Sequence, residues 1–353
     1  MAIPKQNTEL EPKLFRRKLG AWYRRHKREM PWRDTRDPYR IWVSEIMLQQ
    51  TRVAAVIEHY QRFIKLFPTV AALARASEQQ VLAAWSGLGY YRRARMLLKA
   101  AQVLVAEHGG ELPRSSEELR KLPGIGAYTS AAIASIAFGE PVAVVDGNVE
   151  RVLLRLTGRA QSNENTEFVH QLAEHFMPPR RFGASSNAAG DHNQAMMELG
   201  ALVCLPQQPL CPQCPVTAMC ATRGRHKTIQ PERQVTRQAA YLLATRKRGQ
   251  QTEVLMARRA ENASLMPGML ELPPLKDELL PERKPLLRLH HSITNTNYDV
   301  QVYDSKQLLP AVETEARPGY KWVNTSQLHS LPLTGLARKA LRRFDLMTAS
   351  PAD

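Results

Sequence analysis

Apolar residues recur with the period of a helix through the first part of the chain. Over 44–67 and over 149–156 they fall at i, i+3, i+4 and i+7, which predicts half-buried helices. The second of these helices begins behind a start signal at 146–148. The run 129–138 is rich in alanine and isoleucine, which predicts a helix buried on most sides. Because glycine and proline breakers separate these units, residues 10–205 are expected to be all-α.

The pattern changes in the last third of the chain. A short basic stretch without an apolar face, 224–238, predicts a linker. Two β-prone runs, 239–244 and 253–257, are joined by a polar turn at 246–252, and together they predict a hairpin. The remaining predicted elements are strands over 298–303 and 321–323 and an amphipathic helix over 336–344.

A length of 353 residues allows two domains of ordinary size. We predict a helical domain over 1–225, a linker over 226–236 and a small α+β domain over 237–353. Small polar residues at 183–191 predict a mobile surface loop. No apolar run approaches the roughly 20 residues that a membrane span needs, and 1–13 lacks the apolar core of a signal peptide. A protein of the reducing cytoplasm is therefore expected.

The formal net charge of the chain is +16, and its pI is near 9.9. So large an excess indicates an acidic polymer as the partner, and nucleic acid is the first candidate. Solubility alone is the simpler explanation, but the charge is larger than solubility requires.

All four cysteines fall in one short stretch with the spacing C-x6-C-x2-C-x5-C. A disulfide framework would distribute its cysteines, whereas four thiols in one loop indicate a metal or cluster held by thiolates. Thiolates select zinc or iron–sulfur chemistry, and zinc sites favour two separated C-x2-C-type pairs, of which this loop has one. We therefore favour a 4Fe–4S cluster over a zinc ion or free buried thiols. The predicted ligands are Cys204, Cys211, Cys214 and Cys220. Basic residues directly after the loop are candidate phosphate contacts or an ordinary solvated face: Arg223, Arg225, His226 and Lys227.

A glycine-containing turn lies between two helical patterns, at Leu122-Pro-Gly-Ile-Gly126. Its glycines, Gly124 and Gly126, allow the backbone to approach a phosphate closely, and free amides at the following helix start favour an anion. Any tight turn between helices could use these residues, so the motif alone is weakly specific. Further along, Val145-Asp-Gly-Asn148 places Asp146 at a helix start, where it can be an N-cap, a catalytic group, or both.

Five sequence blocks together resemble the adenine-specific mismatch glycosylases of the MutY family, in the endonuclease III superfamily. The blocks are PWR (31–33), WVSEIMLQQT (42–51), GLGYYRRAR (87–95), LPGIGAYT (122–129) and VDGNV (145–149). The cysteine spacing also resembles the cluster loop of that superfamily. The resemblance covers residues 12–222 and is weaker beyond them. It implies an all-α helix–hairpin–helix domain with a 4Fe–4S loop, then a Nudix-like α+β domain that recognises 8-oxoguanine. It further implies a nucleoid-associated monomer that acts on double-stranded DNA containing A:8-oxoguanine or A:G mispairs.

Hydrolysis of an adenine N-glycosidic bond leaves positive charge on the sugar and negative charge on the base. One acid must protonate the base and one carboxylate must face the sugar, as in glycoside hydrolysis. The resemblance implies that Glu45 is the acid at N7 of adenine and that Asp146 stabilises or attacks the sugar cation. It also implies that Tyr128 and Asn148 hold these carboxylates in place. A simpler role for Glu45 is a favourable charge in the first turn of a helix.

The resemblance implies two further sets of residues that contact DNA. A base inside a duplex must be extruded before it can react, and the gap that it leaves must be filled. The flipped adenine would be lined or read by Arg28, Trp32, Arg33 and Glu198. The residues that wedge into the stack or bind the strand would be Gln50, Thr51, Leu88, Tyr90, Gly124 and Gly126. For Leu88 and Tyr90 the alternative is packing within a turn between helices.

Tyr128 indicates the reaction type. The endonuclease III branch has a lysine at this position, which forms a Schiff base and cuts the strand, whereas a phenol cannot form an imine. We therefore expect a glycosylase without efficient lyase activity. Two alternatives are an endonuclease III-like glycosylase/lyase on oxidised pyrimidines and a non-catalytic iron–sulfur protein that binds DNA. The carboxylate pair argues against the second alternative.

The C-terminal region resembles the family's recognition domain most clearly at Leu265-Met-Pro-Gly-Met-Leu-Glu-Leu-Pro273. A pyrophosphohydrolase would need clustered glutamates on a following helix to bind a metal, but the chain continues Pro-Leu-Lys, so that activity is not expected. The family reads 8-oxoguanine with Phe-Ser-His, and the nearest alignment gives His291-Ser292-Ile293. We expect His291 to replace the wedge and Ser292 to keep a polar contact. The alternatives are reading by Thr294 or Asn295, or a plain strand.

Overall fold

The computed structural model describes residues 10–179, 187–225, 235–275, 284–293, 296–307 and 319–347. Its backbone contacts divide the chain into two compact units, each made of two stretches. The first unit comprises Met1–Gln49 and Val103–Pro231, and the second unit comprises Gln50–Gln102 and Glu232–Asp353. Each unit contains a hydrophobic core of its own.

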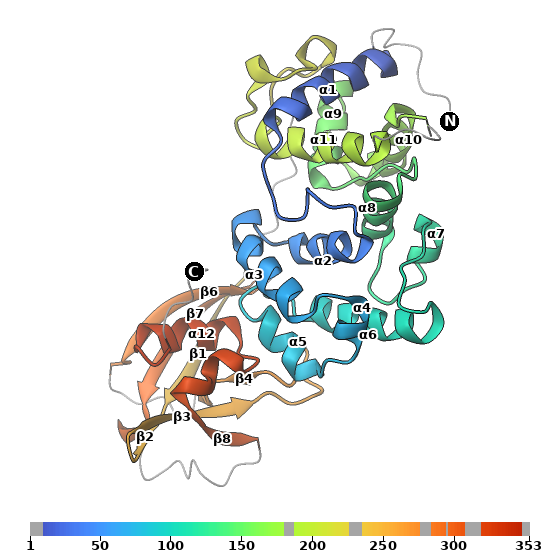
Figure 1. Ribbon diagram of the computed structural model, residues 1–353. Helices are drawn as coiled ribbons and strands as arrows, with labels where there is room; N and C mark the ends of the chain where they lie inside the picture. The colour runs from blue at the N-terminus through green and yellow to red at the C-terminus, as the bar shows by residue number, and fades with distance from the viewer. Residues whose placement is uncertain are drawn as a thin grey trace. The chain divides into compact units, whose positions relative to one another are not determined.

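The first unit is helical throughout its described residues (Figure 1). Four helices, α1, α9, α10 and α11, enclose one core around Phe15, Leu153, Phe176 and Leu199. The loop after α11 packs on the same core, so the cysteines are held by the helices that carry much of the candidate site. The helices of this unit are α1 (Pro12–His26), α2 (Pro38–Leu48), α7 (Ser116–Leu119), α8 (Ala127–Phe138), α9 (Gly147–Thr157), α10 (Thr166–Phe176) and α11 (Ala188–Leu202).

Two of these helices confirm specific predictions. Helix α8 is buried continuously from Thr129 to Ile136, as its alanine-rich and isoleucine-rich composition predicts. Helix α9 begins at the N-cap Asp146, whose side chain accepts hydrogen bonds from the backbone amides of Asn148 and Val149. It ends at Gly158, which has a left-handed φ of 71°.

The loop predicted over 183–191 is wrong in its second half. Asn187 caps α11 by accepting a hydrogen bond from the amide of Gly190, and residues 188–191 form the first turn of that helix. Small residues are needed there because α11 packs closely on α8. A side chain at Gly190 would meet the backbone of Ile136 at 2.9 Å. Residues 180–186 lie outside the described residues.

The second unit opens with α3 (Val53–Leu66), α4 (Val70–Ala74), α5 (Glu78–Trp85) and α6 (Arg92–Glu107), the last of which ends in the first unit. The single helix predicted over 44–67 is wrong, because a turn separates α2 from α3. Gln50 in that turn has a left-handed φ of 53°, which no helix accommodates. The apolar period continues on both sides of the turn, and no glycine or proline marks it, so the sequence pattern does not reveal the break.

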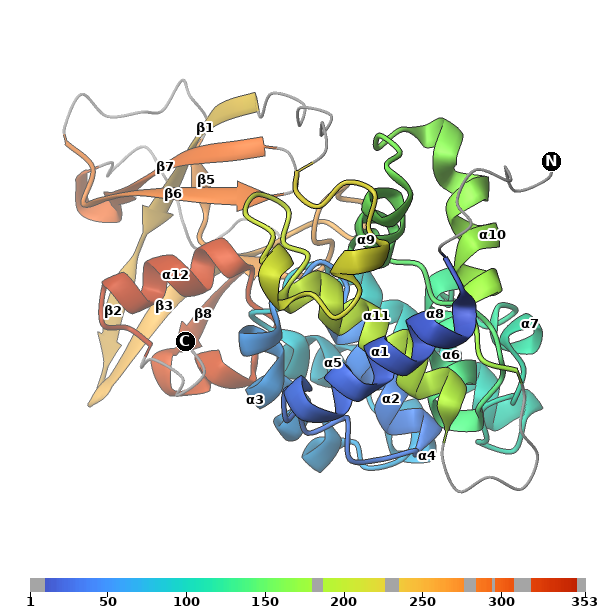
Figure 2. The ribbon, with the colours of Figure 1, turned by 90° about the horizontal axis from the view of Figure 1, so that it is seen from above.

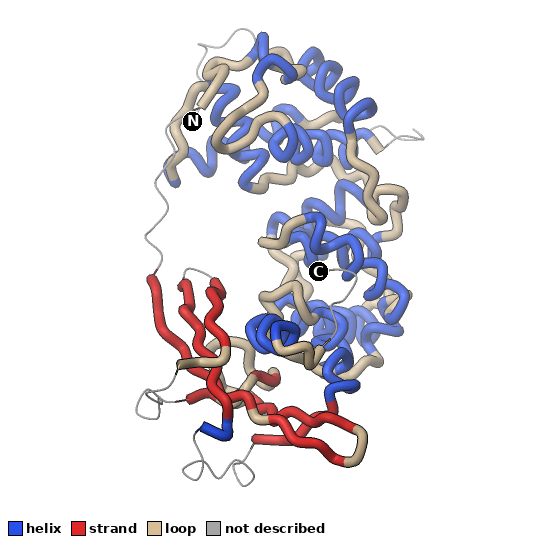
Figure 3. The backbone as a smooth tube through the Cα atoms, turned by 90° about the vertical axis from the view of Figure 1, so that its left-hand side faces the viewer, coloured by secondary structure: helices blue, strands red, loops and turns tan. Residues whose placement is uncertain are grey.

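The described strands all belong to the C-terminal part of the second unit (Figure 3). One sheet has the order β5-β1-β7-β6, in which β1 pairs with β7 in parallel and the other neighbours are antiparallel. The other sheet has the order β2-β3-β4, with β8 paired to β3. The strands are β1 (Val235–Leu243), β2 (Thr245–Arg248), β3 (Gln251–Arg258), β4 (Leu270–Glu271), β5 (Pro274–Leu275), β6 (Leu287–Ile293), β7 (Thr296–Asp304) and β8 (Tyr320–Asn324).

Two predictions for this region need correction. The hairpin exists, but its first arm is β2 and not 239–244, which belongs to β1 in the other sheet. Gly249, with a φ of 62°, forms the tight turn of this hairpin. It lies within the stretch 246–252 that was predicted to be the polar turn. The last two residues of the predicted linker 226–236 are strand, since β1 begins at Val235. Residues 226–234 lie outside the described residues, and the domain boundaries themselves remain a prediction.

Helix α12 (Gly335–Arg343) confirms the predicted amphipathic helix, and β7 and β8 confirm the predicted strands. Figure 2 shows α12 beside the strands, where Leu336, Ala340 and Leu341 join the strand residues in one core. This part of the unit is therefore α+β, as predicted. None of the helices in the described ranges is both long and apolar enough to cross a membrane.

Candidate active site

Glu45 is buried on α2, where Tyr128 is its hydrogen-bond partner among the described residues. Its side chain is 6% exposed, and its Oε2 accepts a hydrogen bond of 2.8 Å from the hydroxyl of Tyr128 at the start of α8. The same hydroxyl lies 3.5 Å from the sulfur of Met197. A carboxyl group buried in this way is costly unless it is neutral or well paired.

The surroundings of Glu45 favour its protonated form near neutral pH. Burial and, less strongly, the negative charge of Asp146 raise the pKa of Glu45 to about 7. The hydrogen bond from Tyr128 and the charge of Arg33 oppose this shift. Burial and the two carboxylates also raise the pKa of Tyr128 well above its ordinary value. The site therefore holds one carboxyl group poised to give up a proton and a phenol that stays neutral.

Asp146 lies at the N-terminus of α9, where three donors surround its carboxylate. Oδ1 accepts from the amides of Asn148 (2.9 Å) and Val149 (2.8 Å), and Oδ2 accepts from the side-chain amide of Asn148 (2.9 Å). Backbone N–H groups and the helix dipole favour a negative charge at this point. The structure thus confirms the capping role and pairs Asn148 with Asp146, while Tyr128 holds Glu45.

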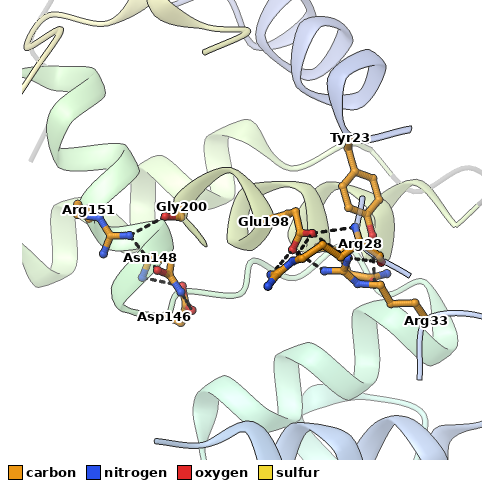
Figure 4. Close-up of polar contacts among 9 residues, drawn as sticks. Tyr23, Arg28, Arg33, Asp146, Asn148, Arg151, Glu198 and Gly200 are labelled. Carbon is orange, nitrogen blue, oxygen red and sulfur yellow. Dashed lines mark hydrogen bonds and ion pairs between the residues drawn. The ribbon is translucent and has the colours of Figure 1, made fainter. Parts of the chain in front are cut away.

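Arg151, which the sequence did not single out, holds Asn148, the residue whose side chain binds this carboxylate. Its Nη2 donates to Oδ1 of Asn148 and to the carbonyl of Gly200, both at 2.8 Å (Figure 4). Its Nε donates to the carbonyl of Cys204 at 2.8 Å. The only local signal for this role is its position one turn after Asn148.

Gly200 on α11 is also needed for this arrangement. A side chain there would come within 2.5 Å of the Cβ of Asn148. Only a glycine therefore lets the N-terminus of α9 approach α11 this closely.

A second polar group lies around Glu198 of α11. It contains three of the four predicted adenine-pocket residues. Glu198 is 1% exposed and accepts hydrogen bonds of 2.7–3.1 Å from Arg28 and Arg33 (Figure 4). Burial alone would raise the pKa of Glu198, but these hydrogen bonds outweigh it and hold the pKa at about 2. Trp32, between the two arginines in sequence, is buried. The charge of Arg33 also lowers the pKa of Glu45, so this second group acts electrostatically on the buried carboxyl group.

The turn at 122–126 has the features expected of an anion-binding helix start. Gly124 has a left-handed φ of 75°, while Leu122 and Ile125 are buried and anchor the turn. Helix α8 begins behind Gly126 without a side-chain cap. Gly126 thus gives the first amides no capping side chain, which suits a phosphate oxygen.

In the second unit the four predicted wedge and strand-binding residues differ in exposure. Tyr90 is 44% exposed, whereas Leu88 is 5% exposed and packs inside. Tyr90 and Gln50 both have left-handed backbone angles, with φ of 48° and 53°. Such strain in residues other than glycine concentrates at functional sites. Thr51 accepts a hydrogen bond of 3.1 Å from Arg93. The structure thus presents Tyr90 for contact and gives Leu88 the packing role of the alternative interpretation.

The four cysteine thiols lie close enough to affect one another. Burial and, less strongly, the charges of Cys204, Cys220 and Cys211 raise the pKa of Cys214 to about 11. Among the described residues, no three Cys, His, Asp or Glu side chains meet the geometry of a site for a single ion. Buried Arg155 donates to the sulfur of Cys204 at 3.4 Å. The backbone amide of Arg223 donates to the sulfur of Cys220, also at 3.4 Å. Donors of this kind stabilise thiolates, so the residues fit a thiolate-held group. His226 and Lys227 lie outside the described residues.

His291 and Ser292 are strand residues of β6, opposite Tyr298 and Asn297 of β7. The Ser292 hydroxyl donates to the Oδ1 of Asn297 at 2.6 Å. His291 is partly buried, and burial together with the charge of Lys339 lowers its pKa. The alternative readers, Thr294 and Asn295, lie outside the described residues.

Comparison with known proteins agrees with this architecture. Residues 43–179 match the model of the HhH-GPD superfamily of base excision DNA repair proteins. The solved structure of a thermostable thymine-DNA glycosylase is 30% identical, with a TM-score of 0.54 over 60% of this chain and 96% of that chain. A trapped endonuclease III–DNA covalent intermediate is 25% identical, with a TM-score of 0.50 over 61% and 97%. Fold and site thus define a helix–hairpin–helix protein of base excision repair.

Sequence relatives narrow the assignment. The human adenine DNA glycosylase is 47% identical over 223 residues, which cover 60% of this chain and 40% of the relative. The Buchnera aphidicola (subsp. Baizongia pistaciae) enzyme of the same name is 37% identical over 222 residues, 62% of this chain and 60% of the relative. The matched region thus spans about half the length of these relatives. The chain belongs to the HhH-GPD superfamily, and over about half of their length it is similar to the adenine DNA glycosylases.

Proposed function

We propose that the protein is a monofunctional DNA glycosylase that removes adenine mispaired with 8-oxoguanine or guanine. The observation that carries this proposal is the pair of unlike carboxyl groups in one site. Glu45 is buried with a pKa raised to about 7, while Asp146 accepts three hydrogen bonds at a helix N-terminus. Two carboxyl groups with divergent environments can act as the acid and the anion of one reaction.

The reaction breaks the C1′–N9 bond of the deoxyadenosine residue, and the bonding electron pair leaves with the base. Protonated Glu45 supplies the proton that neutralises adenine, at N7. The Asp146 carboxylate faces the developing positive charge at C1′, which water finally captures with loss of a proton. Asn148 and Arg151 keep Asp146 oriented, and the neutral hydroxyl of Tyr128 keeps Glu45 oriented.

The remaining site residues would bind the extruded base. Arg28, Arg33 and Glu198 form a rigid, charged wall, because each carboxylate oxygen of Glu198 is held by both arginines. Trp32 would close the pocket with an aromatic surface. Gln50 and Tyr90 would occupy the stack from which the adenine departs, and the turn at Gly124 and Gly126 would bind a phosphate.

One incubation tests the proposal directly. A duplex with a single A:8-oxoguanine pair, treated with the protein and then with alkali, should be cleaved at the adenine. An uncut adenine strand with intact DNA binding would overturn the proposal in favour of a non-catalytic binding protein. Borohydride trapping separates the lyase alternative, since Tyr128 has no amine and a stable covalent adduct in high yield would contradict its assigned role.

We place lesion recognition in the hairpin formed by β6 and β7. Ser292→Ala is expected to lower the preference for A:8-oxoguanine over A:G on the order of fivefold, because one polar contact to the lesion is lost. Single-turnover rates on the two duplexes measure this preference. Ser330→Ala, which removes another exposed hydroxyl bonded within its own segment, is the matched control. If Ser292→Ala keeps the full preference and Thr294→Ala loses it, recognition belongs to Thr294.

The cysteine loop would hold a 4Fe–4S cluster that shapes a surface for docking DNA and takes no part in breaking the bond. Cys211→Ser is expected to lower the iron content and to weaken affinity for duplex DNA, measured by metal analysis and by binding isotherms at several salt concentrations. Gln213→Ala, in the same short helical turn, should change neither quantity. Unchanged affinity in a cluster-free protein would contradict the docking role.

A further inference from the structure

A single backbone carbonyl in the second unit holds both ends of the turn that carries Tyr90. The carbonyl of Leu333 accepts a hydrogen bond from the Ser86 hydroxyl at 3.2 Å and another from the Tyr91 hydroxyl at 3.0 Å. Ser86, Tyr91 and Leu333 are all buried. The amide of Gly87 also donates to the Tyr91 hydroxyl, at 3.4 Å. The C-terminal part of the second unit therefore restrains this turn through buried groups.

The turn needs such restraint because its backbone is strained. Tyr90 has a φ of 48°, and Gly87 and Gly89 on the same turn have φ of 110° and 68°. A left-handed tyrosine persists only where its surroundings hold it. The helical part of the unit contributes Arg93, whose guanidinium donates to the carbonyls of Leu88 and Gly89 at 3.2 Å each. Leu333, in the C-terminal part of the second unit, also restrains the turn that carries Tyr90.

The segment after Leu333 contacts the strand on which lesion recognition is proposed. Thr334 caps α12, and a methyl group placed on Gly335 would lie 3.6 Å from the imidazole of His291 on β6. One turn later, Lys339 donates to the backbone carbonyl of His290 at 2.8 Å. The first turns of α12 thus lie against β6, while Leu333, immediately before α12, holds the Tyr90 turn.

We infer that Leu333–Gly335 couples the β6–β7 hairpin to the Tyr90 turn, and that Ser86 and Tyr91 are positioning residues for discrimination of the base opposite adenine. This inference rests on the proposed function. Contacts at the hairpin shift β6 and the start of α12, and the shared carbonyl passes that shift to both ends of the turn. Tyr90 is then held in its inserted position more firmly when the hairpin is engaged than when it is empty.

The test compares Tyr91→Phe and Ser86→Ala on A:8-oxoguanine and A:G duplexes under single-turnover conditions. Each variant should lower the ratio of the two rates on the order of fivefold, because one buried hydrogen bond to Leu333 is lost. The double variant should lower it further, since the carbonyl then has neither donor. Ser330→Ala loses a serine hydroxyl bond outside the hairpin, so it controls for simple destabilisation. An unchanged ratio in the double variant would overturn the coupling.

Hydrogen exchange of the DNA-free protein gives a second readout that does not depend on catalysis. Amides of 87–90 should exchange faster in Tyr91→Phe and Ser86→Ala than in the control Ser330→Ala. If the unmodified protein releases adenine equally from both duplexes, the proposed lesion preference fails. Exchange at 87–90 then decides whether Leu333 restrains the turn, and unchanged exchange in the double variant would overturn that restraint as well.

Discussion

Glu45→Gln is expected to lower the single-turnover rate of adenine release by about a thousandfold, because an amide cannot deliver a proton to the leaving base. The substitution keeps the size of the side chain and an oxygen that can accept the hydrogen bond from Tyr128. Affinity for the mispaired duplex should therefore stay within about tenfold of that of the unmodified protein. Rapid-quench rates and binding isotherms on the same A:8-oxoguanine duplex measure the two quantities.

The stability of the same variant distinguishes lost chemistry from lost folding. Burial raises the pKa of Glu45 from 4.5 to about 7, so its charged form destabilises the fold increasingly as the pH rises between these values. Glu45→Gln has no such charge and should be more stable than the unmodified protein at pH 8, by on the order of 3 kcal/mol. Glu140→Gln, whose carboxylate bonds Ser116 outside the site, is the matched control for activity.

The pH dependence of the unmodified protein follows from the same shift. The acid must be protonated before it acts, so the rate should be highest below pH 7 and fall as the pH rises through the pKa of Glu45 of about 7. A rate that stays level from pH 6 to pH 9, or a Glu45→Gln variant that retains most of its single-turnover activity, would remove Glu45 as the acid.

Asp146→Asn is the second change with a large expected effect. The developing sugar cation loses its anionic partner, so the rate of adenine release should fall by about a thousandfold. Asparagine is as good an N-cap as aspartate and can accept the same bonds from the amides of Asn148 and Val149. The free energy of unfolding should therefore change by no more than about 1 kcal/mol.

A second capping aspartate in the first unit provides the control. Asp37 caps α2 by accepting from the amides of Tyr39 and Arg40, which is the hydrogen-bond pattern of Asp146 at α9. Asp37→Asn should leave the rate of adenine release unchanged while testing the same change of cap. Equal losses of activity in the two variants would mean that the changed helix cap explains the effect at Asp146. The loss of an anion beside the sugar would then not be the cause.

The sequence by itself determined those features that depend on neighbouring residues. The cap at Asp146, the buried helix α8, the tight turn at Gly124 and the cysteine spacing were all predicted, since each depends on short-range geometry. The residues of the two-carboxylate site came from motif resemblance. That resemblance identified Glu45 and Tyr128, 83 positions apart, which the fold brings within a hydrogen bond.

Tertiary structure decided what local pattern cannot express. The turn between α2 and α3 follows a left-handed Gln50 within an unbroken apolar period, and the arms of the hairpin are β2 and β3 because β1 is paired with β7. Arg151 acquires its role from partners about 50 residues away, Gly200 and Cys204. Leu88 and Tyr90, two residues apart on one turn, differ in exposure because burial depends on what packs around them. Distant contacts set these features, and a sequence read in short windows holds no signal for them.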